Sequence, residues 1–482
     1  MEAVTDVSVR EQLFHQRVRE TIICSLLFGI LYILSYVVIT RFKKHGDFTT
    51  VDDEDAAVNR IALWMCTFTL AVSAGAVLLL PFSIISNEVL LSFPQNYYIQ
   101  WLNGSLIHGL WNLIFLFSNL SLVFLMPFAY LFTEAEGFAG SKKGIMARVY
   151  ETSVVLLLLT LLVLGIVWVA LAIVDEDAAS RESLYDFWEY YLPYLYSCIS
   201  LFGVLLLLLC TPFGLSRMFS VTGKLLVKPR LLEDLDEQLS CTGFEEDAIS
   251  RKISASCWLN FNVELLKKKY LIIKTRRLAL EMRRRASPWQ RNLGYPLVML
   301  LLLGLTGISV LIVCFHVLEL LIDEAAMPKG IQDAHLGKVS FSMFGSLGAA
   351  VQVVLIFYLM VSSFVGFYSS PFFSRLLPQW QDTTMTKIIG NCVSLLVLSS
   401  ALPVFSRTLG ITRFDLLGDF GRFNWLGNFY LVFLYNMAFA GLTTLCLVKK
   451  FTWAVQAELI RALGLHKLPL PVSQTSGPGK IS

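Results

Sequence analysis

The sequence EMRRRASPWQRNLGYPLVMLLLLGLTGISVLIVCFHVLELL, from Glu281 to Leu321, joins two contrasting parts of the chain. Its first residues end a polar segment, Ser216 to Gly294, which contains 16 Lys and Arg residues and nine Asp and Glu residues. The remainder, Tyr295 to Leu321, is long and apolar enough to cross about 30 Å of hydrocarbon as a helix. Because hydrophobic sequence lies on both sides of the polar segment, we predict an insert that divides a membrane protein in two.

The composition indicates the same class of protein. Of the 482 residues, 56% are hydrophobic and only 16% are charged, which leaves too little polar sequence to cover several soluble domains. The formal net charge of +3 says little by itself, because in a membrane protein the distribution of charge between loops is the informative property. Nucleic-acid binding is not indicated. The sequence therefore predicts an all-α polytopic membrane protein.

Nine apolar segments are predicted to be transmembrane helices. They are residues 21–40, 61–85, 106–132, 152–174 and 192–212 before the insert, and 295–321, 344–368, 388–405 and 426–448 after it. The predicted parts are an N-terminal segment (1–20), helices one to five (21–215), the helical insert (216–294), helices six to nine (295–448) and a tail (449–482).

The distribution of positive charge predicts the orientation. With the N-terminus outside and the C-terminus in the cytoplasm, 30 of the 39 Lys and Arg residues lie in cytoplasmic stretches and nine lie outside. Arg407, Arg413 and Arg422, in the predicted external connection 406–425, oppose this trend. We interpret that connection as an ordered loop whose arginines pair with its two aspartates; a re-entrant segment is the alternative.

The second half of the insert has the apolar spacing of one helix face. Val263, Leu266, Tyr270, Ile273 and Leu280 follow steps of three and four, except that Arg277 occupies an intermediate position. With the leucines upstream, at 231, 232, 235 and 239, this pattern predicts a cytosolic helical hairpin. The hairpin is a structural element anchored by positive charges, a platform for a cytosolic partner, or both.

Four arginines are expected just below the sixth span, where they would contact anionic lipid head groups or a cytosolic partner. They are Arg283, Arg284, Arg285 and Arg291. Inside the sixth span and at its end, His316, Glu319 and Asp323 share helical spacing. Polar groups in spans are costly, so these three either line an intramembrane polar pocket or hydrogen-bond between helices.

The N-terminal segment is a candidate ligand-binding region. Its apolar residues are Val9, Leu13, Phe14 and Val18. A segment of this kind can fold on binding a ligand, or it can lie on the membrane surface as an amphipathic lead into the first span. Asn103, Gly104 and Ser105 form a glycosylation sequon in the external loop before the third span.

Motifs for catalysis are absent from the sequence. It has no Walker loop, HExxH, GxSxG or dinucleotide-binding glycine pattern, so we expect no enzyme and no cofactor. The nine cysteines show neither a disulfide framework nor metal-ligand spacing.

Several stretches carry a resemblance to a known family. They are LLLPFSIISNEVLLSF (78–93), NYYIQWLNGSLIHGLW (96–111) and SALPVFSRTLGITRFDLLGDFGRFNWLGNFY (400–430). The chain resembles the limb-region and lipocalin-interacting membrane receptor family over nearly its whole length. WQRNLGYP (289–296) and the LPLPV of the tail make it most similar to the lipocalin-interacting receptor branch.

The resemblance implies a nine-span protein of the plasma membrane or endoplasmic reticulum that captures and endocytoses secreted lipocalins. For this branch it also implies restraint of Wnt/β-catenin signalling through ER-associated ubiquitin-ligase partners. Distant relatives include a lysosomal cobalamin-export component, so a transporter or lateral-cavity binder of lipids or small hydrophobic molecules is the alternative. The small residues Gly345, Gly348 and Ala349 leave a homodimer open.

Overall fold

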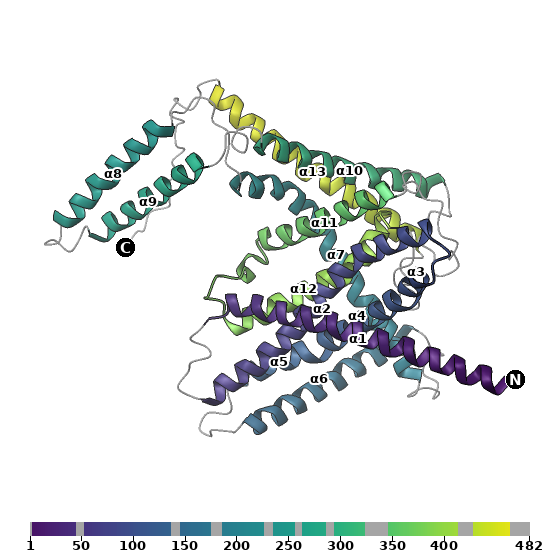
Figure 1. Ribbon diagram of the computed structural model, residues 1–482. Coiled ribbons are helices and arrows are strands. Elements are labelled where there is room, and N and C mark those ends of the chain that lie inside the picture. Colours follow the sequence, from purple (N-terminus) through teal and green to yellow (C-terminus); the bar gives the residue numbers. More distant parts are fainter. Residues whose placement is uncertain are drawn as a thin grey trace. The chain divides into compact units, whose positions relative to one another are not determined.

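The computed structural model describes residues 2–44, 53–135, 145–174, 186–225, 235–255, 263–285, 294–322, 346–412 and 428–462. These residues are almost entirely helical, and they contain nine helical segments that are long and apolar enough to span a membrane (Figure 1). The predicted all-α polytopic class with nine spans is therefore confirmed.

The nine spans and the insert are formed by the following elements. They are α1 (Glu2–Phe42), α2 (Asp53–Ser92), α3 (Tyr97–Trp101), η2 (Leu102–Ile107), α4 (His108–Leu120), η3 (Ser121–Leu125), α5 (Met126–Glu134), α6 (Ile145–Val174), α7 (Asp186–Leu225), α8 (Leu235–Ala255), α9 (Val263–Arg285), α10 (Tyr295–Ile322), α11 (Ser346–Ser369), η7 (Ser374–Leu376), α12 (Met385–Thr408) and α13 (Phe429–Ala462).

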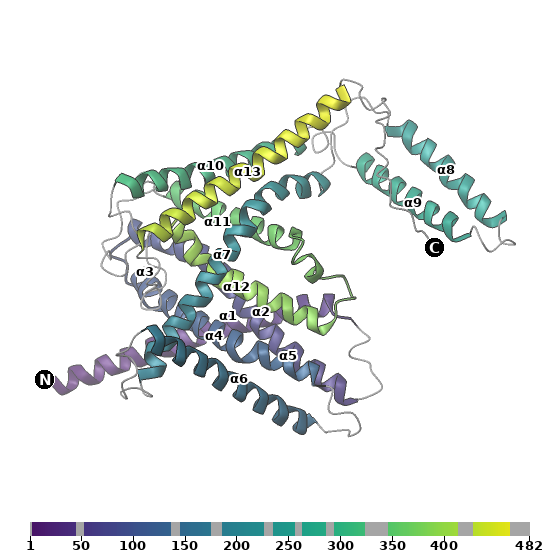
Figure 2. The same ribbon diagram turned by 180° about the vertical axis from the view of Figure 1, so that it is seen from behind.

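The chain divides into two compact units. The first consists of Met1–Ser216 and Val310–Ser482, and the second of Arg217–Ser309, which includes α8 and α9. Helices α8 and α9 pack side by side (Figure 2), as expected for the predicted helical hairpin. The domain limits derived from hydropathy, 216–294 for the insert, stay a prediction.

The first and third spans differ in detail from the helices expected from hydropathy. Helix α1 has 41 residues, a length of about 60 Å, which is twice the thickness of the hydrocarbon layer. Its N-terminal part extends past the neighbouring helices (Figure 1). The third span is interrupted by the π-helical segments η2 and η3, and Pro127 lies directly after η3, at the start of α5.

Helix α12 is the most enclosed of the nine candidate spans. In its most apolar window 78% of the residues are buried, against 6% in α6. It packs against α2 and α5 (Figures 1 and 2). The Ser73 hydroxyl of α2 donates a hydrogen bond of 2.9 Å to Ser399, and the Cys392 thiol lies 3.6 Å from the carbonyl oxygen of Cys66.

Helices α7 and α11 cross at a pair of glycines. A Cβ atom on Gly214 would lie 1.8 Å from the carbonyl oxygen of Ser362, and one on Gly366 would lie 1.9 Å from that of Cys210. The close approach lets the Thr211 and Ser363 hydroxyls hydrogen-bond at 2.8 Å. This crossing is the small-residue packing that membrane helices use where no hydrophobic force drives them together.

The small-residue face predicted as a dimer contact lies at the other end of α11. Gly348 is buried within the single chain, and Ala349 is partly buried. Gly345 lies outside the described residues. The homodimer therefore stays a prediction.

Replacing either glycine of the crossing by alanine is expected to destabilise the bundle. Because the new methyl group meets backbone atoms that a rotamer change does not move, Gly214→Ala or Gly366→Ala should lower the free energy of unfolding by about 1–3 kcal/mol or more. Thermal unfolding of purified protein in detergent measures the change. Gly441→Ala in α13, where a Cβ meets nothing within 4 Å, is the matched control, and equal stability of all three variants would contradict the crossing.

Candidate functional site

The beginning of the first span is docked on α3 and η2, at the start of the third span. The Glu20 carboxylate accepts hydrogen bonds from the indole N–H of Trp101, at 3.1 Å, and from the Ser105 hydroxyl. The Arg19 guanidinium lies over the Trp101 ring, 3.6 Å from its centroid. A cation over an aromatic face and a carboxylate at its edge match the charge distribution of the ring, so these contacts hold α1 in place.

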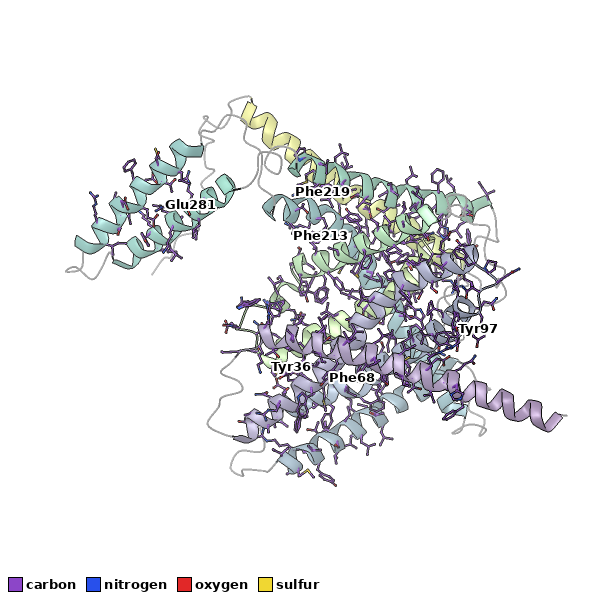
Figure 3. The ribbon with its side chains drawn as sticks, viewed as in Figure 1. Tyr36, Phe68, Tyr97, Phe213, Phe219 and Glu281 are labelled. Carbon is purple, nitrogen blue, oxygen red and sulfur yellow. The ribbon has the colours of Figure 1, made fainter. Side chains whose placement is uncertain are left out.

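One turn further out, α1 contacts α3 again. The Gln16 side-chain amide donates a hydrogen bond of 2.7 Å to the Tyr97 hydroxyl. Figure 3 shows Tyr97 near the point where α1 leaves the bundle. The sequence did not indicate that Tyr97 and Trp101 have partners on α1, because those contacts join residues about 80 positions apart.

Two of the four predicted ligand residues have described side chains. Phe14 is 65% exposed and Val18 is 40% exposed, and they continue the exposed stripe of Ile22 and Leu26 at intervals of four residues. Val9 and Leu13 lie in α1, but their side chains are outside the described part. The exposed apolar stripe of the span thus continues into the projecting part of α1. The interval of four residues in the sequence could have revealed this stripe.

The predicted glycosylation site lies in a helical segment. Asn103 belongs to η2, and its sequon residue Ser105 is the one bound to Glu20. Glycosylation of Asn103 stays a prediction.

His316 and Glu319 are brought together, as their spacing predicts. The His316 Nδ1 atom lies 3.9 Å from the Glu319 Oε2 atom; the imidazole is buried, and the carboxylate is about one-third exposed. Gly410 lies against the imidazole with a positive φ of 71°, and a Cβ there would be 2.5 Å from the ring. Asp323 lies outside the described residues, so the polar pocket of three residues stays a prediction.

One predicted loop residue belongs instead to a helix. Arg407 lies in the last turn of α12 and is buried, whereas the hydropathy pattern ended the eighth span at Phe405. A buried arginine lowers mean hydropathy in its own window, which is why the predicted span was too short. Arg413 and Arg422 lie outside the described part of the chain.

The residue that breaks the apolar pattern of the insert joins its two helices. Arg277 of α9 donates a hydrogen bond of 2.9 Å to Glu246 of α8, and a second one of 3.1 Å to Glu281 one turn along its own helix. Figure 3 labels Glu281 on α9. The hydrogen bond from Arg277 lowers the pKa of Glu246. Polar pairing therefore replaces apolar contact at this position of the hairpin.

The outer surface of the hairpin carries large apolar side chains. Leu271, Ile272 and Leu278 of α9 and Phe244 of α8 are each about half exposed or more. Lys268 and Lys269 are exposed beside them. The predicted contact residues Arg283, Arg284 and Arg285 lie in the last turns of α9, with side chains outside the described part, and Arg291 is not described.

Removing the charge of Glu246 is expected to loosen the hairpin. Since the pKa of Glu246 is lowered in the folded state, the pair contributes stability above about pH 4.5, and this contribution is lost as the pH falls through the lowered pKa. Glu246→Gln should therefore speed amide hydrogen exchange in α8 and α9 of the full chain at pH 7. Glu245→Gln, an exposed neighbour, is the control, and identical exchange in both variants would contradict a stabilising pair.

The described side chains offer no metal site. No group of three His, Cys, Asp or Glu residues among them converges on one point. Seven cysteines are described, and each is a free thiol.

A comparison with known proteins places the chain in a family. A family model for LMBR1-like membrane proteins matches residues 20–270 and 262–451. The chain belongs to this family. It is 82% identical to Protein LMBR1L of Xenopus laevis, over all of both chains, and 76% identical to Protein LMBR1L of Homo sapiens, over 97% of this chain and 96% of the relative. It is 67% identical to the human Limb region 1 protein homolog, over 98% and 96% of the two chains.

The family match confirms the resemblance seen in the sequence. The chain is a multi-pass membrane protein of the LMBR1-like family, whose description names a membrane protein and no enzymatic activity. No solved structure matches the chain.

Proposed function

We propose that the protein is a membrane receptor and adaptor that captures secreted lipocalins on its outer face and restrains Wnt/β-catenin signalling from its cytosolic face. The proposal places the N-terminus outside and the C-terminus and hairpin in the cytoplasm, in the plasma membrane and the endoplasmic reticulum. The proposal goes beyond membership of the LMBR1-like family, and it is supported by the resemblance of the sequence to the lipocalin-interacting receptor branch.

The observation that carries the receptor proposal is the projecting end of α1. Phe14 and Val18 are exposed on a helix that Arg19 and Glu20 hold against Trp101. A rigid helix loses less conformational freedom on binding than a flexible segment does, and it presents its apolar side chains in a fixed direction. These side chains suit a partner with an apolar contact surface.

Changing the two exposed apolar residues to serine is expected to reduce lipocalin uptake. Burying each side chain in a complex contributes about 1.5–3 kcal/mol, so Phe14→Ser/Val18→Ser should lower uptake of a labelled lipocalin about tenfold or more. Uptake is compared in cells with equal surface expression. The control is His15→Ser/Arg17→Ser on the same turns. Unchanged uptake in Phe14→Ser/Val18→Ser would contradict the proposed contact between these residues and the lipocalin.

The adaptor part of the proposal rests on the exposed face of the hairpin. Leu271 and Ile272 are 64% and 60% exposed, beside exposed lysines. An apolar face with a basic rim is typical of a surface that docks a partner in water. The partners proposed here are ER-associated ubiquitin-ligase and Wnt pathway components.

Replacing the apolar pair of α9 is expected to release these partners. Leu271→Ser/Ile272→Ser should reduce recovery of ubiquitin-ligase components with the full-length chain by about tenfold, because each lost apolar contact weakens binding. Quantitative affinity purification measures the change, with Glu245→Ser/Asp247→Ser, two exposed residues of α8, as the matched control. A partner set identical to that of the unchanged chain would refute docking on this face.

The alternative function, transport or lateral binding of lipids or small hydrophobic molecules, is favoured by one observation. The third span contains two π-helical segments, which often mark functional sites. Near the second one, the buried hydroxyls of Ser118 and Ser121 have no hydrogen-bond partner among the described residues. Movement of a labelled lipid by the reconstituted protein would favour this alternative over the receptor.

A further inference from the structure

The connection between α11 and α12, residues 370–384, is held in one conformation by several contacts. Its Phe373 ring stacks on Phe367 of α11, with 4.3 Å between the centroids. The Asn391 side-chain amide of α12 donates a hydrogen bond of 2.7 Å to the carbonyl oxygen of Leu376. Gln381 has a φ of 58°, a conformation that a non-glycine residue keeps only where its surroundings impose it.

The end of α1 is tied to the same connection. The Thr383 backbone N–H donates to the Phe42 carbonyl oxygen at 3.2 Å, and the Lys44 N–H donates to the Thr383 carbonyl oxygen at 3.1 Å. The Trp380 ring meets the Phe42 ring edge-on at 5.7 Å. Three candidate spans, α1, α11 and α12, therefore end together, and the connection lies where the membrane meets water.

This fixed connection presents apolar side chains outward. Phe372 is 85% exposed, Trp380 is 61% exposed and Leu377 is 52% exposed. A flexible loop could fold such groups inward, but the contacts with α1, α11 and α12 prevent this. Exposed aromatic rings at the end of a span are typical of the interface, where the ring lies at the level of the lipid head groups.

The stretches of chain that carry these apolar residues are mainly basic. The stretches 41–44 and 370–387 carry five basic residues and one acidic residue; they are Arg41, Lys43, Lys44, Arg375, Lys387 and Asp382. Lys44 lies 4.0 Å from Asp382, whereas Arg41, Arg375 and Lys387 pair with no carboxylate among the described residues.

We propose that residues 370–387 and the end of α1 form a binding surface for anionic phospholipid head groups. Arg375 and Lys387 attract the phosphate and the acidic head group, while Phe372 and Trp380 enter the boundary between head groups and acyl chains. In the proposed orientation this surface faces the cytoplasm, where anionic phospholipids are concentrated. The surface is independent of lipocalin capture and of the hairpin.

The test is lipid retention by the full-length protein. Purified chain is equilibrated with an equimolar mixture of phosphatidylserine and phosphatidylcholine, and the retained lipids are identified by native mass spectrometry. A photoactivatable phosphatidylserine, with crosslinks mapped by peptide, locates the contact. We expect the unchanged chain to retain an excess of phosphatidylserine and to crosslink within residues 370–387.

Two variants decide the outcome. Arg375→Gln/Lys387→Gln should reduce the excess of phosphatidylserine at least threefold and abolish the crosslink, and Phe372→Ser/Trp380→Ser should weaken retention of the lipid. Lys449→Gln/Lys450→Gln, which removes the same charge at the end of another span, should leave both readouts unchanged. Equal losses of phosphatidylserine in the two charge variants would indicate a general attraction between basic residues and anionic lipid, and would overturn the proposal. An unchanged excess of phosphatidylserine in Arg375→Gln/Lys387→Gln would also overturn it, even if that variant lost a protein partner.

Discussion

The enclosure of α12 is the constraint on which the rest of the bundle depends. In hydrocarbon no hydrophobic force drives one apolar helix against another, so close packing and hydrogen bonds between side chains have to hold the spans together. Helix α12 meets this requirement on several sides. Its Ser399 accepts a hydrogen bond from Ser73 of α2, and its Ala401 packs so closely on α7 that only a glycine, Gly203, fits there. The polar side chains of the core therefore serve mainly to hold the helices together.

The two ends of the first span use aromatic rings and charge in different ways. At the start of the apolar span, Arg19 and Glu20 of α1 both contact Trp101, and the apolar residues nearer the N-terminus are exposed. At the end where α1 stops, the rings of Phe372 and Trp380 are exposed on a fixed connection beside cations. This difference separates a surface suited to an apolar protein partner from one suited to an anionic lipid surface.

Much of the architecture was predictable because hydropathy and charge are local properties of the sequence. The apolar segments, the basic insert and the helix-forming spacing of α9 are each visible within one window of residues. The candidate contacts were less predictable. His316 was identified by its spacing and Val18 as an apolar residue of the N-terminal segment, but Trp101 was not identified as the partner of Arg19 and Glu20. Arg407 was assigned to a loop because its charge masked the last turn of a span.

The sequence by itself determined that the chain is a helical membrane protein with nine apolar spans, since the thickness of the bilayer converts segment length directly into a count of crossings. It also identified the helical insert. Only the tertiary structure decided which span is enclosed, which glycines let α7 and α11 touch, and that Arg277 joins the two helices of the hairpin. The physical reason is that these features depend on pairs of residues far apart in the chain, and no local pattern specifies the partner.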